Sequence, residues 1–145
     1  MARLDYYQIE LDMQTALKAN AGLAGVTVDV ERDVNFGESD SVVIYLRRRD
    51  APSGMQAMNA GTRTRFLVHI ELYCMSCHLE MATARRNRDN LLGKVELACM
   101  ADRTFANAQV ATSWIEGGEF EDGRGGTGFY SLGTIRVVLD ASAIS

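Results

Sequence analysis

The chain has few of the features that mark linkers, membrane spans or disulfide scaffolds. A single proline in 145 residues argues against a proline-rich linker. No apolar run approaches the ~18 residues that a membrane helix needs. Three cysteines are an odd number, and the N-terminal stretch "MARLDYYQIELDMQ" has acidic residues where a signal peptide has apolar ones, so we expect reduced thiols. The net charge of −4 argues mildly against a dedicated nucleic-acid binder.

What the sequence does contain indicates one intracellular domain. Hydrophobic residues make up 47% of the chain and charged residues 23%, which is typical of a folded protein with a core. A chain of this length can bury such a core without metal or disulfide bonds. We therefore expect residues 1–145 to form a single domain, without internal repeats or low-complexity tracts.

The hydrophobic pattern predicts the element order α-β-β-β-α-β-β. The first helix is expected from Asp5 to about Asn20, with Asp5 as its N-cap and Gln8 as the returning partner of a capping box. Alternating apolar and polar residues predict a strand in "VTVDV", residues 26–30. A second strand, "VVIYL" at 42–46, is expected to pair with it as a hairpin.

A long loop, a third strand and a second helix are expected next. The loop, Arg47–Arg65, exceeds the roughly 12–15 residues usual in a compact domain, which indicates a functional or disordered segment. The strand is predicted over Arg63–Tyr73, and the helix over Cys77–Met100 with Ser76 as its N-cap. The arginines in the middle of this helix are interpreted as a solvated face; they are Arg85, Arg86 and Arg88.

Two strands close the predicted fold, over Gln109–Ile115 and Phe129–Asp140. The segment Glu116–Gly128 between them is rich in glycine and acidic residues, so we interpret it as a mobile loop or a long hairpin tip. Its acidic residues are expected to be solvating charge; they are Glu119, Glu121 and Asp122. Trp114 is expected in the core.

The stretch "HIELYCMSCH", residues 69–78, matches three chemical motifs. Its "CMSCH" is the attachment motif of c-type haem, but that attachment follows export and the motif here closes an alternating strand. Read as C-x-x-C between a strand and a helix, Cys74 and Cys77 resemble a redox site. A thioredoxin-like fold would need a proline downstream of these cysteines, whereas Pro52 lies upstream.

Strand geometry argues against a zinc site in the same stretch. His69 and Cys74 are five residues apart on one strand, roughly 16 Å, and point to opposite faces. Only Cys74, Cys77 and His78 could converge, and tetrahedral zinc needs a fourth ligand. We therefore interpret the stretch as side chains that pack the end of a strand.

No other motif specifies an active site. "GRGGTG" lacks the following Lys-Ser/Thr of a phosphate-binding loop and precedes a strand. The nucleophile-elbow pattern G-x-S-x-G is absent. We expect no enzyme activity, no catalytic residue, no metal and no cofactor.

The layout of the whole chain resembles the tail-terminator proteins of long-tailed bacteriophages. The landmarks are "ALKANAGLAGVTVDVERD", "RTRFLVHIELYC", "LLGKVELACMADRTF" and "GTIRVVLDAS", and the resemblance covers nearly all of the chain. It implies an α+β fold with a single mixed, mainly antiparallel sheet of about five strands and two helices on one face. It also implies a homo-oligomeric ring, typically of six subunits, that caps the tail tube, ends its polymerisation and joins the tail to the head-side connector or stopper protein.

The same resemblance implies a location in the virion tail after assembly in the cytoplasm of the host bacterium. DNA would pass through the ring without being read in a sequence-specific way, and no membrane would be involved. From side-chain chemistry alone, charge next to adaptable apolar groups suggests partner contacts. The residues predicted for this role are Arg47, Arg48, Arg49, Met55, Met58, Phe120 and Arg124.

Two other interpretations stay open. Another phage neck or tail-completion protein could share this layout. A small intracellular ligand-binding domain, or a redox domain that uses Cys74 and Cys77, belongs to a different class. A ligand-binding domain would have a concave apolar pocket with convergent polar groups.

Overall fold

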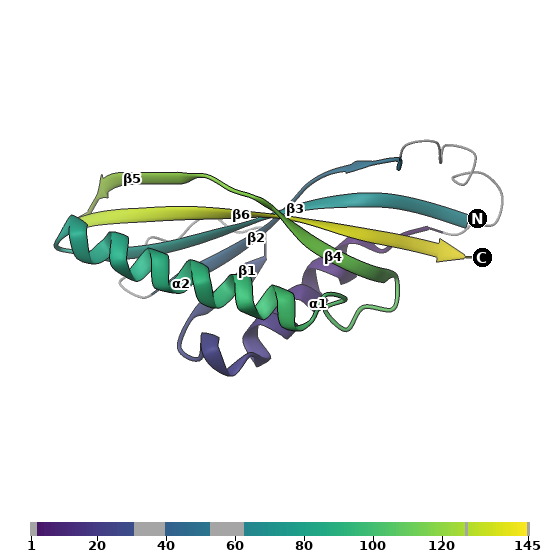
Figure 1. Cartoon of the computed structure of the whole chain (residues 1–145), viewed down its shortest axis with the longest axis horizontal. Coiled ribbons are helices and arrows are strands. Elements are labelled where there is room, and N and C mark those ends of the chain that lie inside the picture. Colours follow the sequence, from purple (N-terminus) through teal and green to yellow (C-terminus); the bar gives the residue numbers. More distant parts are fainter. Residues whose placement is uncertain (1–2, 31–39, 53–62, 127, 145) are drawn as a thin grey trace.

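The computed structural model describes residues 3–30, 40–52, 63–126 and 128–144. They form an α+β fold in which two helices cover one face of a mixed, mainly antiparallel sheet, as expected (Figure 1). The elements in chain order are α1 (Tyr6–Ala19), the short 3-10 helix η1 (Ala21–Leu23), β1 (Thr27–Val30), β2 (Ser41–Asp50), β3 (Arg63–His78), α2 (Met81–Ala101), β4 (Val110–Gly117), β5 (Phe120–Gly125) and β6 (Gly128–Ile144). The strand order is β1-β2-β3-β6-β4, and β5 also pairs with β6.

The first helix begins at the predicted cap but without the predicted capping box. The Asp5 carboxylate accepts a hydrogen bond from the backbone N–H of Gln8 at 3.1 Å. The Gln8 side chain donates instead to Asp12, one turn further along the helix, and the Asp5 N–H donates to the side chain of Gln109. Only half of the capping box is therefore made, because Gln109, just before β4, accepts the hydrogen bond from the other donor.

The first two strands do not form the predicted hairpin. Thr27 lies opposite Ser41 and Val30 opposite Ile44, so β1 and β2 run parallel. In a parallel pair the chain must cross back to the end of the sheet at which the first strand began. In a hairpin the chain turns round where the first strand ends. The alternation of apolar and polar residues is the same for both pairings, which is why the sequence pattern could not separate them.

The two long central strands extend further than predicted. β2 continues through Asp50 and β3 through His78, because both remain paired with neighbouring strands to these points. The predicted loop Arg47–Arg65 therefore begins and ends inside strands, and residues 53–62 lie outside the described part of the chain. The helix predicted from Cys77 starts only at Met81.

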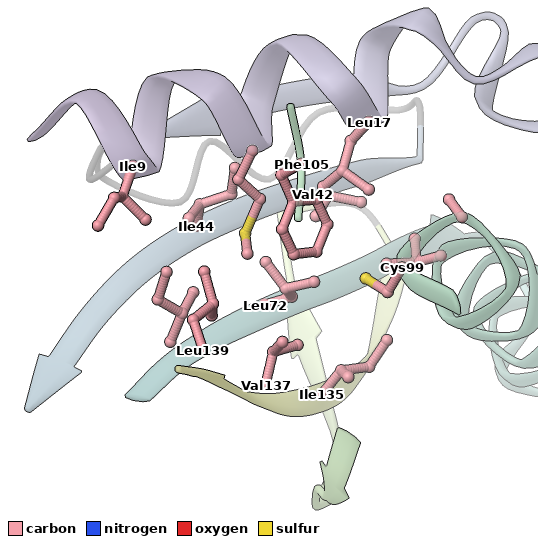
Figure 2. Close-up of a cluster of buried hydrophobic side chains, with 14 of the residues drawn as sticks. Ile9, Leu17, Val42, Ile44, Leu72, Cys99, Phe105, Ile135, Val137 and Leu139 are labelled. Carbon is pink, nitrogen blue, oxygen red and sulfur yellow. The ribbon is translucent and has the colours of Figure 1, made fainter. Parts of the chain in front are cut away.

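The central strands and the helices enclose one hydrophobic core. Val68, Ile70 and Leu72 point from β3 toward the helices and are almost fully buried, as the alternation predicted. Figure 2 shows Ile9 and Leu17 of α1 facing the sheet, among side chains from several strands. Burial of each such side chain stabilises the fold by about 1.5–3 kcal/mol. The core therefore fixes which face of the sheet is left for other contacts.

Candidate functional site

The face of the sheet that points away from both helices, here called the helix-free face, carries charged and aromatic side chains. Because side chains alternate along a strand, the residues between the buried positions of β3 point to this face. Glu71 is one of them, and it lies opposite Tyr45 on β2 and Arg136 on β6. Other side chains on this face are Arg47, Arg48, His69, Tyr73, Trp114 and Glu116.

A β-bulge brings two consecutive arginines to the helix-free face. Leu46 lies opposite Ile70 and Arg48 opposite His69, so Arg47 is an extra residue in β2. An extra residue interrupts the strict alternation of side chains. Arg47 and Arg48 therefore share one face, whereas Arg49 lies opposite the buried Val68 and points toward the helices. The predicted contact residues Arg47, Arg48 and Arg49 are thus divided between the two faces.

Arg47 is held by a polar and aromatic cluster. Its Nε lies 3.0 Å from a carboxylate oxygen of Glu71, and its guanidinium also donates to the Tyr73 hydroxyl. The guanidinium carbon is 5.1 Å from the centre of the Tyr45 ring and 5.3 Å from that of the Tyr73 ring, within the range of cation–π attraction. The Tyr73 hydroxyl in turn donates to Glu71 at 2.6 Å. The cluster fixes Arg47 on the sheet surface.

A shallow cavity of about 200 Å³, here called the basic pocket, lies beside this cluster. It is lined by Arg47, Arg48, His69, Ile70, Glu71, Glu116 and Arg136. Arg48 is anchored more weakly than Arg47, since its partner Asp50 is half exposed and also lies 2.9 Å from His69. The lining holds three arginines and two glutamates, and Asp50 pairs with one of the arginines, Arg48.

A second cavity of about 400 Å³, here called the acidic pocket, shares Glu71 with the basic pocket. It is lined by Glu71, Tyr73, Glu119, Phe120, Glu121, Leu132 and Thr134, and none of these side chains is basic. The helix-free face is therefore uneven in charge: all three arginines line the basic pocket, whereas Glu119 and Glu121 line the adjoining acidic pocket.

Two glycines between β4 and β5 position the acidic side chains. Gly117 has a φ of +136°, which residues with a side chain rarely adopt. At Gly118, a Cβ atom would lie 1.6 Å from the backbone oxygen of Thr134. Beyond this kink the chain rejoins β6, where the Glu119 carbonyl accepts a 2.8 Å hydrogen bond from the Thr134 N–H. Much of the segment predicted as a mobile loop or hairpin tip, Glu116–Gly128, is thus a strand at the sheet edge, and the predicted element order lacks this strand.

A separate ion-pair cluster fastens β5 to the helix side of the sheet. Asp122 accepts hydrogen bonds from Arg85 at 2.7 Å, from Arg88 at 3.4 Å and from Ser131. The bonds from Ser131 and Arg85 hold the pKa of the Asp122 carboxyl below its usual value. Arg88 is 9% exposed and also pairs with Asp89 at 2.8 Å. The predicted solvated arginine face is therefore wrong for Arg88, and Asp122 is more than solvating charge.

The aromatic residues near β5 are only partly in the predicted positions. Phe120, a predicted partner contact, is 64% exposed, and the guanidinium of Arg88 covers its ring at 4.5 Å. Arg124 lies 5.2 Å from the centre of the Phe129 ring, near the tip of the hairpin. Trp114 is 39% exposed, which contradicts its predicted place in the core, because its position on β4 faces away from the helices. Met55 and Met58 lie outside the described residues.

The "HIELYCMSCH" stretch lies entirely within β3, and not at the start of a helix. Cys74 points into the core, whereas Cys77, three residues further on, points to the opposite face about 10 Å away. A disulfide needs Cα atoms closer than about 7 Å, so these two cannot bridge in this strand. Ser76 is no helix cap either, because its hydroxyl donates to Asp40 at 2.7 Å.

The chemistry of the thiols follows from their burial. Desolvation raises the pKa of Cys74 and Cys77, and raises that of Cys99 to about 12, so all three are protonated at neutral pH. Protonated thiols are poor nucleophiles and poor metal ligands. Within the described parts of the chain, no group of three or more His, Cys, Asp or Glu side chains is arranged to hold a metal ion.

Several residues of the two pockets were not among the predicted contact residues: Glu71, Glu119, Glu121, Arg136 and His69. Two signals in the sequence could have pointed to some of them. The polar positions between Val68, Ile70 and Leu72 already define the outward side of a strand. A pair of adjacent glycines before charged residues favours a kink at a sheet edge.

Among the helices of the described residues, none is long and apolar enough to cross a membrane. No protein-family model matches the chain, and no curated protein matches its sequence.

Proposed function

We propose that this protein is a tail-terminator protein of a long-tailed bacteriophage, a structural subunit that forms a ring on the end of the tail tube. In this role it stops tube polymerisation and joins the tail to the head-side connector. The proposal starts from the resemblance of the sequence landmarks and from the order of helices and strands.

The observation that carries the proposal is the one-sided construction of the sheet. Both helices cover one face of the sheet (Figure 1). The opposite face carries arginine, glutamate and aromatic side chains around two cavities. A charged, gently hollowed surface with aromatic anchors suits a protein–protein interface. Small-molecule sites are mostly apolar and deeply concave, whereas arginines and glutamates make up most of the lining of the basic pocket, and the acidic pocket contains three glutamates.

The edge formed by β4 and β5 also supports an assembly role. Neither strand has a partner on its outer side among the described residues, so its backbone donors and acceptors are open at the edge of the sheet. The exposed glutamates of β5 and of the kink lie along this edge, where like charges discourage indiscriminate strand pairing. An open, charged edge is suited to a partner of defined chemistry.

Deleting the gene from the phage that encodes it tests the proposal. The expected result in electron micrographs is a population of tails with uncontrolled length, accompanied by heads without tails. Uniform tails that remain attached to heads would refute it. Antibody labelling of intact virions would locate the protein along the tail axis. A terminator is expected at the head-proximal end of the tail tube, whereas other neck or completion proteins lie elsewhere on the axis.

A further inference from the structure

The helix-free face carries arginines and exposed glutamates at different places. Arg47 and Arg48 lie on β2, toward one side, and Glu119 and Glu121 lie on or next to β5, at the opposite edge. A surface with one sign of charge would repel its own copies. A surface with both signs at opposite sides is complementary to a second copy of itself when the two meet head to tail.

The acidic side consists of exposed residues at the edge of the sheet. Glu119 and Glu121 are exposed at the kinked edge that Gly117 and Gly118 impose. The basic side is recessed, with Arg48 and Arg136 around a cavity of about 200 Å³. The acidic edge of one copy and the basic pocket of another are therefore opposite in charge.

We infer that the acidic β4–β5 edge of one copy docks into the basic pocket of the next, with Glu119 and Glu121 facing Arg48 and Arg136. The contact uses different surfaces on the two copies, so repetition closes into a ring or continues as a filament. The inference rests on the proposed function only for the choice of a closed ring. It accounts for the presence of exposed arginines on a chain whose net charge is −4.

A second copy suits this surface better than nucleic acid does. Glu71 and Glu116 line the basic pocket itself, and Glu119 and Glu121 line the adjoining acidic pocket. A polyanion laid on the face would meet these carboxylates as well as the arginines.

Charge exchange provides the test. A basic-pocket variant carries Arg48→Glu and Arg136→Glu, and an edge variant carries Glu119→Arg and Glu121→Arg. The mass of the wild-type protein and of each variant is measured in solution at several concentrations and salt levels. The wild type is expected to associate, increasingly as salt is lowered, and each variant alone is expected to lose at least about tenfold in association constant. Mixing the two variants should restore a complex of the wild-type mass. The acidic edge of the first variant then meets the arginines of the second, and the basic edge of the second meets the glutamates introduced in the first.

Controls separate the interface from folding. The variant Arg86→Glu with Lys94→Glu changes the charge by the same amount on the exposed side of α2 and should associate like the wild type. Circular dichroism checks that every variant is folded. If charge reversal opposite Glu71 prevents folding, Arg48→Gln with Arg136→Gln removes the positive charge without adding a negative one and should still weaken association.

Several results would overturn the inference. One is an association constant that neither variant changes. Another is a mixture of the two variants that does not form a complex of the wild-type mass. A third is a mixed complex of only two chains, which indicates a symmetric face-to-face pair. Binding of a short DNA duplex that the basic-pocket variant abolishes without a change of protein mass would make nucleic acid the occupant. The phage assay is independent. If the purified protein associates as expected but deletion of its gene leaves tail length unaltered, the proposed function is refuted and this contact is not.

Discussion

Removing the Asp122 side chain should reveal how firmly β5 is fastened to α2. The carboxylate accepts three hydrogen bonds, and the two partners on α2 are Arg85 and Arg88. Ser131 on β6 supplies the third, from a fully buried position. The substitution Asp122→Ala leaves the mostly buried Arg88 with Asp89 as its remaining carboxylate partner. The substitution therefore removes the Asp122 carboxylate without leaving the guanidinium of Arg88 unpaired.

The cost follows from the exposure of each partner. Arg85 has 57% of its side chain exposed, so its ion pair contributes about 0–1 kcal/mol. The hydrogen bond from the buried Ser131 to a charged acceptor contributes about 1.5–3 kcal/mol. The longer contact with Arg88 adds little, because Asp89 already compensates that guanidinium. We expect Asp122→Ala to lower the free energy of unfolding by about 2–3 kcal/mol, or the midpoint of thermal unfolding by about 4–10 °C.

The pH dependence of this difference has a defined sign. Because the pKa of Asp122 is lowered in the folded protein, its ionised form stabilises the fold above the pKa of the unfolded chain, about 4. That stabilisation is lost as pH falls through the lower pKa of the folded state. The margin of the wild type over Asp122→Ala should therefore be constant from pH 7 to about 5 and shrink in more acidic solution.

Urea denaturation followed by far-ultraviolet circular dichroism measures both quantities. Arg86→Ala is the control, because Arg86 is exposed on the same helix, and it should change stability by less than about 0.5 kcal/mol. A loss below about 0.5 kcal/mol for Asp122→Ala at pH 7, or a margin that does not shrink in acid, would refute the assigned role of the cluster.

Three further predictions concern the kink, the thiols and the core. Gly118→Ala should destabilise the fold by about 2–3 kcal/mol, because the added carbon collides with backbone; a melting temperature equal to that of the wild type would contradict this. In the native protein a thiol reagent should modify Cys77 alone, faster as pH rises above 9, while Cys74 and Cys99 react only after unfolding; a count of modified thiols by mass spectrometry decides the matter. Leu72→Ala should cost about 3–4 kcal/mol in urea denaturation, since this side chain is fully buried, and a cost below about 1 kcal/mol would place it outside the core.

Local patterns in the sequence predicted the elements whose stability depends on local chemistry. The alternation of Val68, Ile70 and Leu72 gave the buried face of β3, and Asp5 marked the start of α1. Both depend on residues close together in the chain. Whether β1 pairs with β2 in parallel or antiparallel depends on the end of the sheet at which the second strand starts. The alternation of apolar and polar residues carries no information about this direction.

The errors on α2 had a different cause. The buried positions Ala84, Leu91 and Val95 define a stripe at helical spacing, and Arg88 falls inside it. Charge alone suggested a solvated residue, whereas the stripe indicates burial and therefore a need for carboxylate partners. Those partners include Asp122, 34 residues away, so the compensation of this charge could not be read from the helix itself.

In the two pockets, too, some features depend on neighbouring residues in the sequence, and others depend on how the strands pair. The run Arg47–Arg49 was recognisable as a candidate contact segment, but the bulge that places two of its arginines on one face arises from pairing with β3. Arg136 joins them only because β6 lies beside β3 in the sheet. Sequence chemistry therefore identified part of the surface, and the sheet topology supplied the rest.

Tail length in a phage that carries the basic-pocket substitutions Arg48→Glu and Arg136→Glu tests the central claim most directly. Electron micrographs should show tails of uncontrolled length and unattached heads, because ring subunits that cannot dock leave the tube uncapped. The matched substitutions Arg86→Glu and Lys94→Glu on α2 should leave tail length uniform. Uniform, head-bearing tails in both phages would contradict the account, since the helix-free face would then have no part in ending the tail.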